Sequence, residues 1–207
     1  MSEQEEVSPA QERYEFIRAV IAMLHLAQLD LRAVDMFGRT PQAALRSVRF
    51  IFFCVPVVML MAWPQAGEFT KITGYSPLVY SLLEASRILI TSFGFLLFMH
   101  HLCRRLGVAQ NFAHYMCVQC YVSLPTVMVV ALLNGLWLAA GVSETGENLL
   151  RTLVYAAQII IDWAITYGTL RIKPTAAFAI CALAVLFSML VQYFMLLVVI
   201  LTGPIAI

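Results

Sequence analysis

The sequence predicts an all-α integral membrane protein with five transmembrane helices, preceded by an amphipathic helix. Composition supports this prediction, because hydrophobic residues make up 61% of the 207 residues and charged residues only 12%. Soluble domains carry about 25% charged residues. The chain also contains five apolar segments of about the length that a helix needs to cross the hydrocarbon of a bilayer. They cover residues 47–63, 78–102, 113–140, 149–170 and 175–202.

The connections between these segments are short and contain residues that interrupt helices. These residues are Pro64, Gly74, Gly107, Gly141 and Pro174. We therefore expect two parts: a cytoplasmic head over residues 1–46 and a five-span membrane domain over residues 47–207. This division leaves no room for a separate soluble domain.

Residues 13–36 predict a helix in the head, because apolar residues recur there at steps of three and four. The apolar positions are Ile17, Val20, Leu24, Ala27, Leu31 and Val34. Charged residues such as Arg18, Asp30 and Arg32 interrupt the segment, and each would cost about 2.5–3.5 kcal/mol at the centre of a membrane. We therefore expect a helix that does not span. Two placements remain open: flat in the inner membrane interface, or packed under the bundle as a cytoplasmic cap.

Lysine and arginine are distributed unevenly along the chain, and cytoplasmic loops carry the excess of these residues. Ten of the thirteen fall on the side of the N-terminus: Arg13, Arg18, Arg32, Arg39, Arg46, Arg49, Arg104, Arg105, Arg171 and Lys173. The opposite side has Lys71 and Arg151, and Arg87 lies within a span. The distribution predicts a cytoplasmic N-terminus and a C-terminus outside.

Three charged residues lie within the predicted spans: Glu84, Arg87 and Asp162. Such residues are costly in lipid, so they usually face the interior of the bundle and mark function. Glu84 and Arg87 are spaced i, i+3 and can pair on one helical face. At 1.5 Å per residue, Arg87 lies about 14 Å and Asp162 about 20 Å below the outer surface. Amides fall at similar depths, at Asn134, Gln158 and Gln192 and also at Gln119.

Two interpretations of this intramembrane polar network remain open. It can form a polar pathway or a substrate site at the midplane, or it can supply interhelical hydrogen bonds that fix the register of the helices. On the fifth span, a stripe of small residues runs along one face: Ala177, Cys181, Ala184 and Ser188, continued by Gln192. Small residues let helix backbones approach closely in lipid. We expect this small-residue stripe to be a helix-packing seam, inside the bundle or against a neighbouring subunit.

Histidine and cysteine gather where the second span ends and the third begins, at His100, His101, Cys103, His114, Cys117 and Cys120. Imidazoles and thiolates suit zinc or copper, but these spacings do not match a standard zinc pattern. The sequence therefore predicts no metal site and no cofactor. It also shows no nucleophile paired with a base, so we expect no catalytic residue and no enzyme. The net charge of +1 gives no reason to expect a nucleic-acid partner.

The stretch HHLCRRLGVAQNFAHYMCVQCYVSLPTVMVVALL, with Gly107, Tyr121 and Pro125, resembles the Yip family of five-span membrane proteins. The fourth span and its turn, LVYAAQIIIDWAITYGTLRIKPTAAFAI, resemble the family as well, and the resemblance covers about residues 40–202. It implies a cytoplasmic N-terminus, five spans and a short outer C-terminus. Eukaryotic members engage small GTPases through a long N-terminal region, which is replaced here by a short head. The compact form is similar to bacterial members, which implies a bacterial cytoplasmic (inner) membrane.

The leading hypothesis from the sequence is a non-enzymatic, Yip-like membrane organiser or accessory subunit of a membrane complex. Its partners would be the lipid bilayer and either another membrane protein or a second copy of the chain. The alternative is a small transporter or channel built around Glu84, Arg87 and Asp162. A hydrated cavity that reaches these residues would favour the transporter, whereas a sealed polar layer would favour the organiser.

Overall fold

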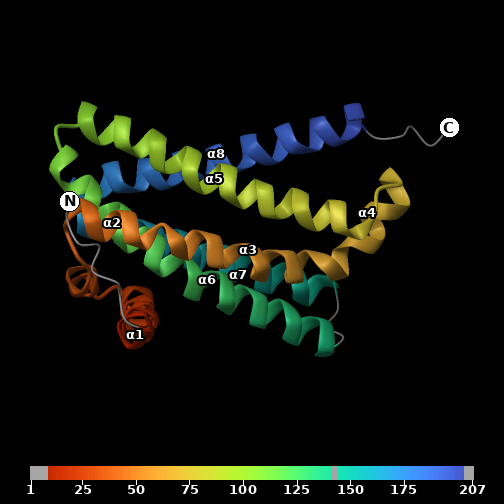
Figure 1. Ribbon diagram of the computed structural model, residues 1–207, viewed down its shortest axis with the longest axis horizontal. Coiled ribbons are helices and arrows are strands. Elements are labelled where there is room, and N and C mark those ends of the chain that lie inside the picture. The colour runs from red at the N-terminus through yellow and green to blue at the C-terminus, as the bar shows by residue number, and fades with distance from the viewer. Residues whose placement is uncertain (1–8, 141–143, 203–207) are drawn as a thin grey trace.

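The computed structural model describes residues 9–140 and 144–202, and every regular element in these ranges is helical (Figure 1). The long helices are α3 (Arg49–Ala62), which continues α2 (Pro41–Ser47), then α5 (Pro77–Arg105), α6 (Phe112–Ala140), α7 (Glu144–Leu170) and α8 (Pro174–Thr202). The shorter helices are α1 (Pro9–Ala27) and α4 (Ala66–Thr73). Three 3-10 turns cover Leu31–Met36, Trp63–Gln65 and Ala109–Asn111.

Within the described ranges, five stretches are long and apolar enough to cross a membrane: Pro41–Gln65, Pro77–Arg105, Ala109–Trp137, Thr152–Leu170 and Pro174–Leu201. The predicted class is confirmed, because the protein is all-α and has five candidate spans after a shorter N-terminal helix. The apolar outer surfaces of these helices contact the lipid bilayer.

The first span begins at Pro41, earlier than the predicted residue 47. The sequence around Thr40 explains this start, because its Oγ1 accepts a hydrogen bond from the Ala43 N–H at 3.2 Å. Pro41 occupies the first turn, where its missing N–H has no partner to lose. Val48 keeps helical dihedral angles between α2 and α3, so the two helices form one continuous span.

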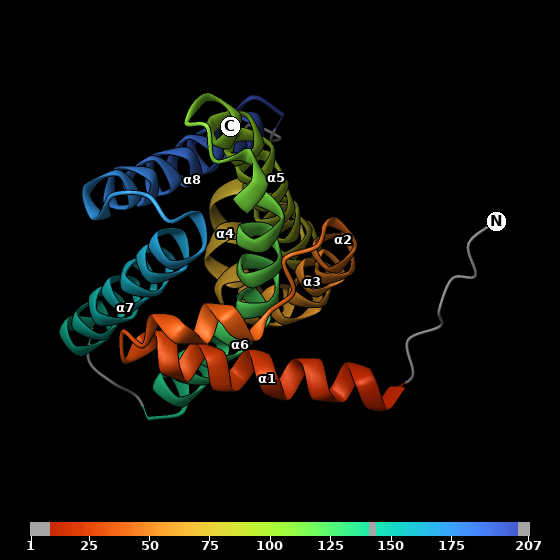
Figure 2. The ribbon, with the colours of Figure 1, turned by 90° about the vertical axis from the view of Figure 1, so that its left-hand side faces the viewer.

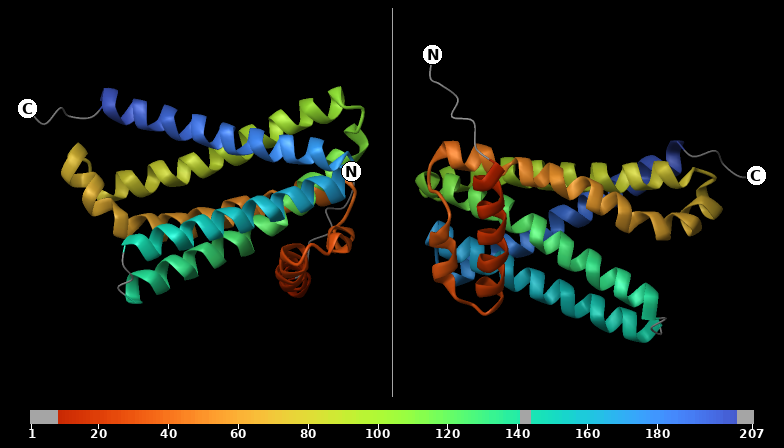
Figure 3. Two further views of the ribbon diagram at one scale, coloured as in Figure 1. Left: turned by 180° about the vertical axis from the view of Figure 1, so that it is seen from behind. Right: turned by 60° about the horizontal axis from the view of Figure 1, so that its bottom comes forward.

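The long helices lie side by side, with α5 and α8 crossing on one side of the bundle (Figures 1 and 3). α6 packs against α1, α2, α3 and α7, whereas α8 packs mainly against α5 and α7. We call the end of the bundle that carries α1, Leu106–Val108 and Arg171–Lys173 the basic end, and the opposite end the α4 end. This arrangement places α6 centrally and α8 at the periphery.

The N-terminal helix is shorter than the predicted helix over residues 13–36. It ends at Ala27, and Leu29 adopts a left-handed conformation with φ 62°. The chain then forms the 3-10 turn Leu31–Met36, capped by Asp30, whose Oδ1 accepts from the Arg32 N–H. The predicted end of the helix at residue 36 was wrong. Leu31 and Val34 continue the apolar spacing of the helix, but they belong to the separate 3-10 turn.

The face of α1 that packs against the bundle also differs from the predicted stripe. Its buried residues are Ala19, Ala22, Met23 and Leu26, whereas Ile17 and Leu24 are exposed. Alanines let α1 lie close to α6 and α7, and it runs across these helices at the basic end (Figure 2). The head is therefore packed on the bundle and still presents an apolar face outward.

Specific contacts tie the segment after α1 to α6. The Phe37 and Tyr121 rings stack with centroids 5.4 Å apart, and the Phe50 ring lies 4.6 Å from Tyr121. His114 Nε2 lies 2.8 Å from the Val34 carbonyl oxygen, and both residues are buried. These contacts join the head, the first span and the third span in one buried cluster.

Candidate functional site

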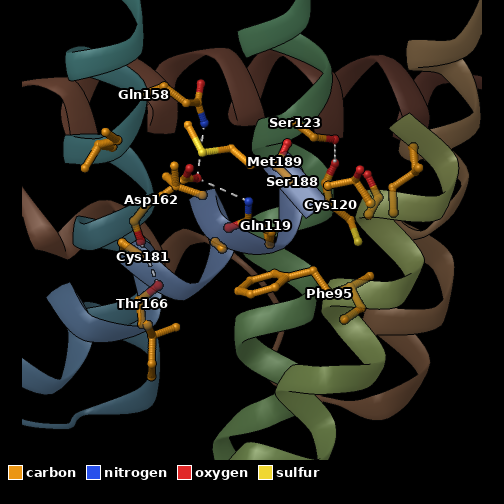
Figure 4. A pocket seen from close by; sticks show the side chains of 18 of the residues that line it. Phe95, Gln119, Cys120, Ser123, Gln158, Asp162, Thr166, Cys181, Ser188 and Met189 are labelled. Carbon is orange, nitrogen blue, oxygen red and sulfur yellow. Dashed lines mark hydrogen bonds between the residues drawn. The ribbon is translucent and has the colours of Figure 1, made fainter. Parts of the chain in front are cut away.

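Two cavities of about 660 and 500 Å³ lie among the spans, and both reach the polar residues at the middle of the bundle. Figure 4 shows residues that line the larger one. The larger lies between α5, α6, α7 and α8, and the smaller extends toward the α4 end as far as Gln65 and Trp137. Seven residues line both cavities: Arg87, Gln119, Ser123, Tyr155, Gln158, Asp162 and Gln192. Toward the basic end the larger cavity is lined by the buried residues Leu96, Tyr115 and Ile180.

Asp162 of α7 is held by two amides. Its Oδ1 accepts a hydrogen bond from Gln158 Nε2 at 3.1 Å and another from Gln119 Nε2 at 3.2 Å. Gln158 precedes Asp162 by one helical turn, and Gln119 reaches across from α6 (Figure 4). A carboxylate accepts hydrogen bonds at both oxygens, but within the described residues neither bond goes to Oδ2.

Glu84 and Arg87 form the charged pair that their spacing predicts. Arg87 Nε donates to Glu84 Oε2 at 2.8 Å, and Arg87 Nη2 lies 2.7 Å from the same oxygen. The two side chains are 25% and 31% exposed, so the pair is half-buried and borders the cavity. Among the described contacts, no hydrogen bond joins Arg87 to Asp162. The Arg87 guanidinium instead bonds Glu84, which lies one turn away on the same helix.

The remaining amides of the predicted network take different roles. Asn134 Nδ2 donates to the Val130 carbonyl oxygen of its own helix at 3.0 Å, and the side chain lines the smaller cavity. Gln192 of α8 is exposed and lines both cavities. The structure therefore brings Glu84 to Arg87 and Gln158 to Asp162, while Asn134 and Gln192 lie on the cavity walls.

The small-residue stripe of α8 is packed at one end and open at the other. Ala177 and Cys181 are buried near the basic end. Cys181, Ala184, Ser188 and Gln192 line the larger cavity. Helix α8 diverges from α7 toward the α4 end (Figure 1). Small side chains leave space when no facing helix fills the gap, so this part of the stripe forms a cavity wall.

The histidine and cysteine residues near the basic end have other neighbours. His114 contacts the Val34 carbonyl, and His101 Nδ1 lies 2.9 Å from the Leu97 carbonyl of its own helix. The His100 ring packs edge-on against Phe112, with centroids 5.0 Å apart. Cys103, Cys117 and Cys120 are buried and form no disulfide among the described residues. No group of three or more His, Cys, Asp or Glu side chains in the described part of the chain could hold a metal ion.

Other lining residues were not predicted as part of the site. Thr91 follows Arg87 by four residues, so it lies on the same helical face, and it lines the larger cavity beside Ser92. Ser123 follows Gln119 by the same spacing. Both residues lie one helical turn after a charged or amide residue of the predicted network, and this spacing could have predicted them. Tyr115 and Tyr155 carry no comparable signal, because aromatic residues are common throughout these spans.

No family model, no curated protein and no solved structure matches this chain. The resemblance to Yip-type proteins therefore stays a prediction from the sequence. What the molecule does must be argued from its own geometry.

Proposed function

We propose that this protein is a non-enzymatic, small-solute transporter that admits its solute from the α4 end into the cavity at the middle of the bundle. One observation carries this proposal: the two cavities meet at Arg87, Gln119 and Asp162. Polar groups that served only to fix helix register would be enclosed by neighbouring helices. Ligand sites typically occupy pockets of about 300–1,000 Å³ with mostly apolar walls and a few polar groups, which agrees with this arrangement.

The role of organiser or accessory subunit, suggested by the Yip resemblance, is the second candidate. Its support comes from the outer face of α8, where Leu186, Leu190, Tyr193 and Leu197 are all more than half exposed. Lipid covers such a surface as readily as a protein partner does. The cavity distinguishes the two functions, because an organiser has no use for solvent access to Asp162.

We further propose that the basic end faces the cytoplasm, in a bacterial inner membrane. The uneven distribution of lysine and arginine supports this orientation. The outward face of α1 fits the inner interface, since Ile17, Ile21 and Leu24 are exposed on it while Arg18 lies on a neighbouring edge. Amphipathic helices of this kind bury their apolar face at the boundary between headgroups and acyl chains.

Solvent access to the cavity can be tested with a matched pair of cysteine variants on α8. In a background without the native cysteines, Ser188→Cys places a thiol on the cavity wall, whereas Leu190→Cys places one on the outer face, where Leu190 is 67% exposed. A neutral, water-soluble thiol reagent, hydroxyethyl methanethiosulfonate, should modify the first variant in membranes and spare the second. Protection of both thiols would reject a hydrated cavity and with it the transporter.

Orientation needs a separate pair of variants in the same background. The sequence predicts that Thr145 lies in an outer connection, but its side chain is not among those that the structure describes. Lys71→Cys in α4 is therefore the better probe of the outer side. Gln110→Cys probes the basic end, and both native residues are exposed. An impermeant reagent added outside intact cells should label Lys71→Cys and spare Gln110→Cys. The reverse pattern would invert the topology.

A further inference from the structure

We infer that the cavity takes a monovalent organic cation: an ammonium group bound at Asp162, attached to a small apolar body. This inference rests on the proposed function, because it names the class of solute that the same cavity would carry. It depends on three properties of the lining: its net charge, its free hydrogen-bonding atoms and the surface around them.

The charge of the lining is the first property. The described Asp, Glu, Lys, Arg and His residues that line the two cavities are Glu84, Arg87 and Asp162. Glu84 and Arg87 neutralise each other through their ion pair. Asp162 has two amides as partners, and no cationic side chain among the described residues bonds to it. A charged side chain within a membrane span is costly, so a bound cation would offset a charge that no described side chain neutralises.

The second property is that the free hydrogen-bonding atoms of Gln119 and Asp162 are acceptors. Gln119 and Gln158 both turn their Nε2 donors toward Asp162 Oδ1. As a result, Gln119 Oε1 is buried and has no partner among the described residues, and Asp162 Oδ2 receives neither of these bonds. An ammonium group has three donors and no acceptor, and it would satisfy both oxygens. An anion would meet carboxylate and amide oxygens and gain no donor from either glutamine.

The surface around Asp162 is the third property. Phe95, Ile159 and Met189 line the larger cavity together with Tyr155. A metal cation requires a close shell of oxygen ligands, which these apolar side chains do not provide. Aromatic rings attract ammonium groups through their faces, and apolar walls suit the carbon skeleton of an amine. A cavity of 660 Å³ holds such a molecule, whereas a bare ion would leave most of it empty.

Charge selectivity can be measured on the Ser188→Cys variant with three thiol reagents of similar size. Aminoethyl methanethiosulfonate is a cation, sulfonatoethyl methanethiosulfonate is an anion and the hydroxyethyl reagent is neutral. We expect the cationic reagent to react about tenfold faster than the anionic one, relative to their rates with a free thiol, because a charged cleft concentrates counter-ions. Butylammonium or phenethylammonium should also slow the reaction, whereas butyrate at the same concentration should not.

Two further variants assign the selectivity to Asp162. Asp162→Asn keeps an oxygen that accepts from the glutamine amides, and it should reduce the ratio of the two rates to about one. Gln192→Lys adds a positive charge on the cavity wall, away from the Asp162 hydrogen bonds. It brings the net charge of the lining to zero and should also lower the ratio toward one. Gln192→Met is its uncharged control and should change the ratio far less than Gln192→Lys does. Because Gln192 is exposed, this pair remains informative even where Asp162→Asn does not fold.

The outcomes separate the inference from the proposed function. Equal rates for all three reagents, faster reaction of the anion, or protection by butyrate would overturn cation binding and leave a hydrated cavity in place. A Ser188→Cys thiol that reacts with none of the reagents, including the neutral one, would overturn both proposals.

Discussion

α6 and α8 have the same length and a similar hydropathy, but opposite surroundings. Each contains 29 residues, and their most apolar stretches have mean hydropathies of 2.0 and 2.5. In that stretch 39% of α6 is buried within the protein, compared with 11% of α8. Hydropathy thus identifies a span but does not show whether it lies at the centre or at the edge of a bundle, because lipid and a protein interior are equally apolar.

The two helices differ in what their side chains contact. α6 carries residues with specific partners, such as His114 at Val34, Gln119 at Asp162 and Tyr121 between two phenylalanine rings. α8 carries small residues toward the cavity and large aliphatic residues outward. Polar and aromatic contacts hold α6 in place, whereas α8 packs against α5 and α7 mainly through apolar residues. Three comparisons test this contrast.

The largest effect is expected for the buried tyrosine of α6. Tyr121→Ala removes a 5% exposed ring that packs against Phe37 and Phe50. It should lower the free energy of unfolding by about 3–5 kcal/mol, the usual cost of deleting a buried aromatic side chain. Tyr193→Ala on α8 is the matched control, since Tyr193 is 71% exposed. Reversible unfolding in mixed detergent micelles measures both, and equal losses would contradict the contrast between the helices.

A smaller effect is expected within α8, where one stripe has two environments. Ala177→Leu adds bulk at a position that is 0% exposed, and it should cost about 1–3 kcal/mol through overpacking. Ala184→Leu projects into the cavity and should leave the free energy of unfolding nearly unchanged. The same change should slow thiol labelling of Ser188→Cys. A destabilisation of Ala184→Leu as large as that of Ala177→Leu would show that the whole stripe is a packing seam.

The spacing of residues along single helices predicted much of the candidate site. Glu84 and Arg87 pair as the i, i+3 spacing indicates, and Gln158 bonds Asp162 at i, i+4. Counting depth from the span ends placed Gln119 level with Asp162, and these two side chains meet. Depth alone gives no direction around a helix axis. It therefore could not show that Arg87 faces Glu84 rather than Asp162.

The cavity could not be predicted, because it depends on how α8 tilts away from α7. Small residues such as Ala184 and Ser188 fit both a tight helix–helix interface and the wall of an open cavity. Their sequence pattern therefore does not distinguish the two. The end of α1 was missed for a related reason. Leu31 and Val34 continue the periodic pattern beyond Leu29, and only the left-handed conformation of that residue reverses the chain.

The charged pair on α5 should show a still smaller effect, because it is half-buried. Arg87→Leu leaves Glu84 without its partner and should lower the free energy of unfolding by about 1–2 kcal/mol, below the cost of breaking a fully buried pair. The double variant Glu84→Leu, Arg87→Leu should recover most of this loss. Combining Arg87→Leu with Asp162→Leu should not, since Asp162 is held by amides. Recovery by the second combination alone would make Asp162 the true partner of Arg87.

The smallest effect is expected on the outer face of α8, and it separates the two candidate functions. Leu190→Ala and Leu197→Ala remove side chains that are 67% and 52% exposed. Where lipid covers this face, each truncation exchanges one apolar contact for another and should change the free energy of unfolding by less than about 0.5 kcal/mol. The mass of the protein extracted in mild detergent should also stay the same. Where a partner subunit covers the face, the truncations remove packed contacts, so the extracted assembly should become smaller while the separated chain remains folded. Loss of a partner upon Leu190→Ala, without any change in thiol labelling at Ser188→Cys, would therefore favour the organiser and place its interface on α8.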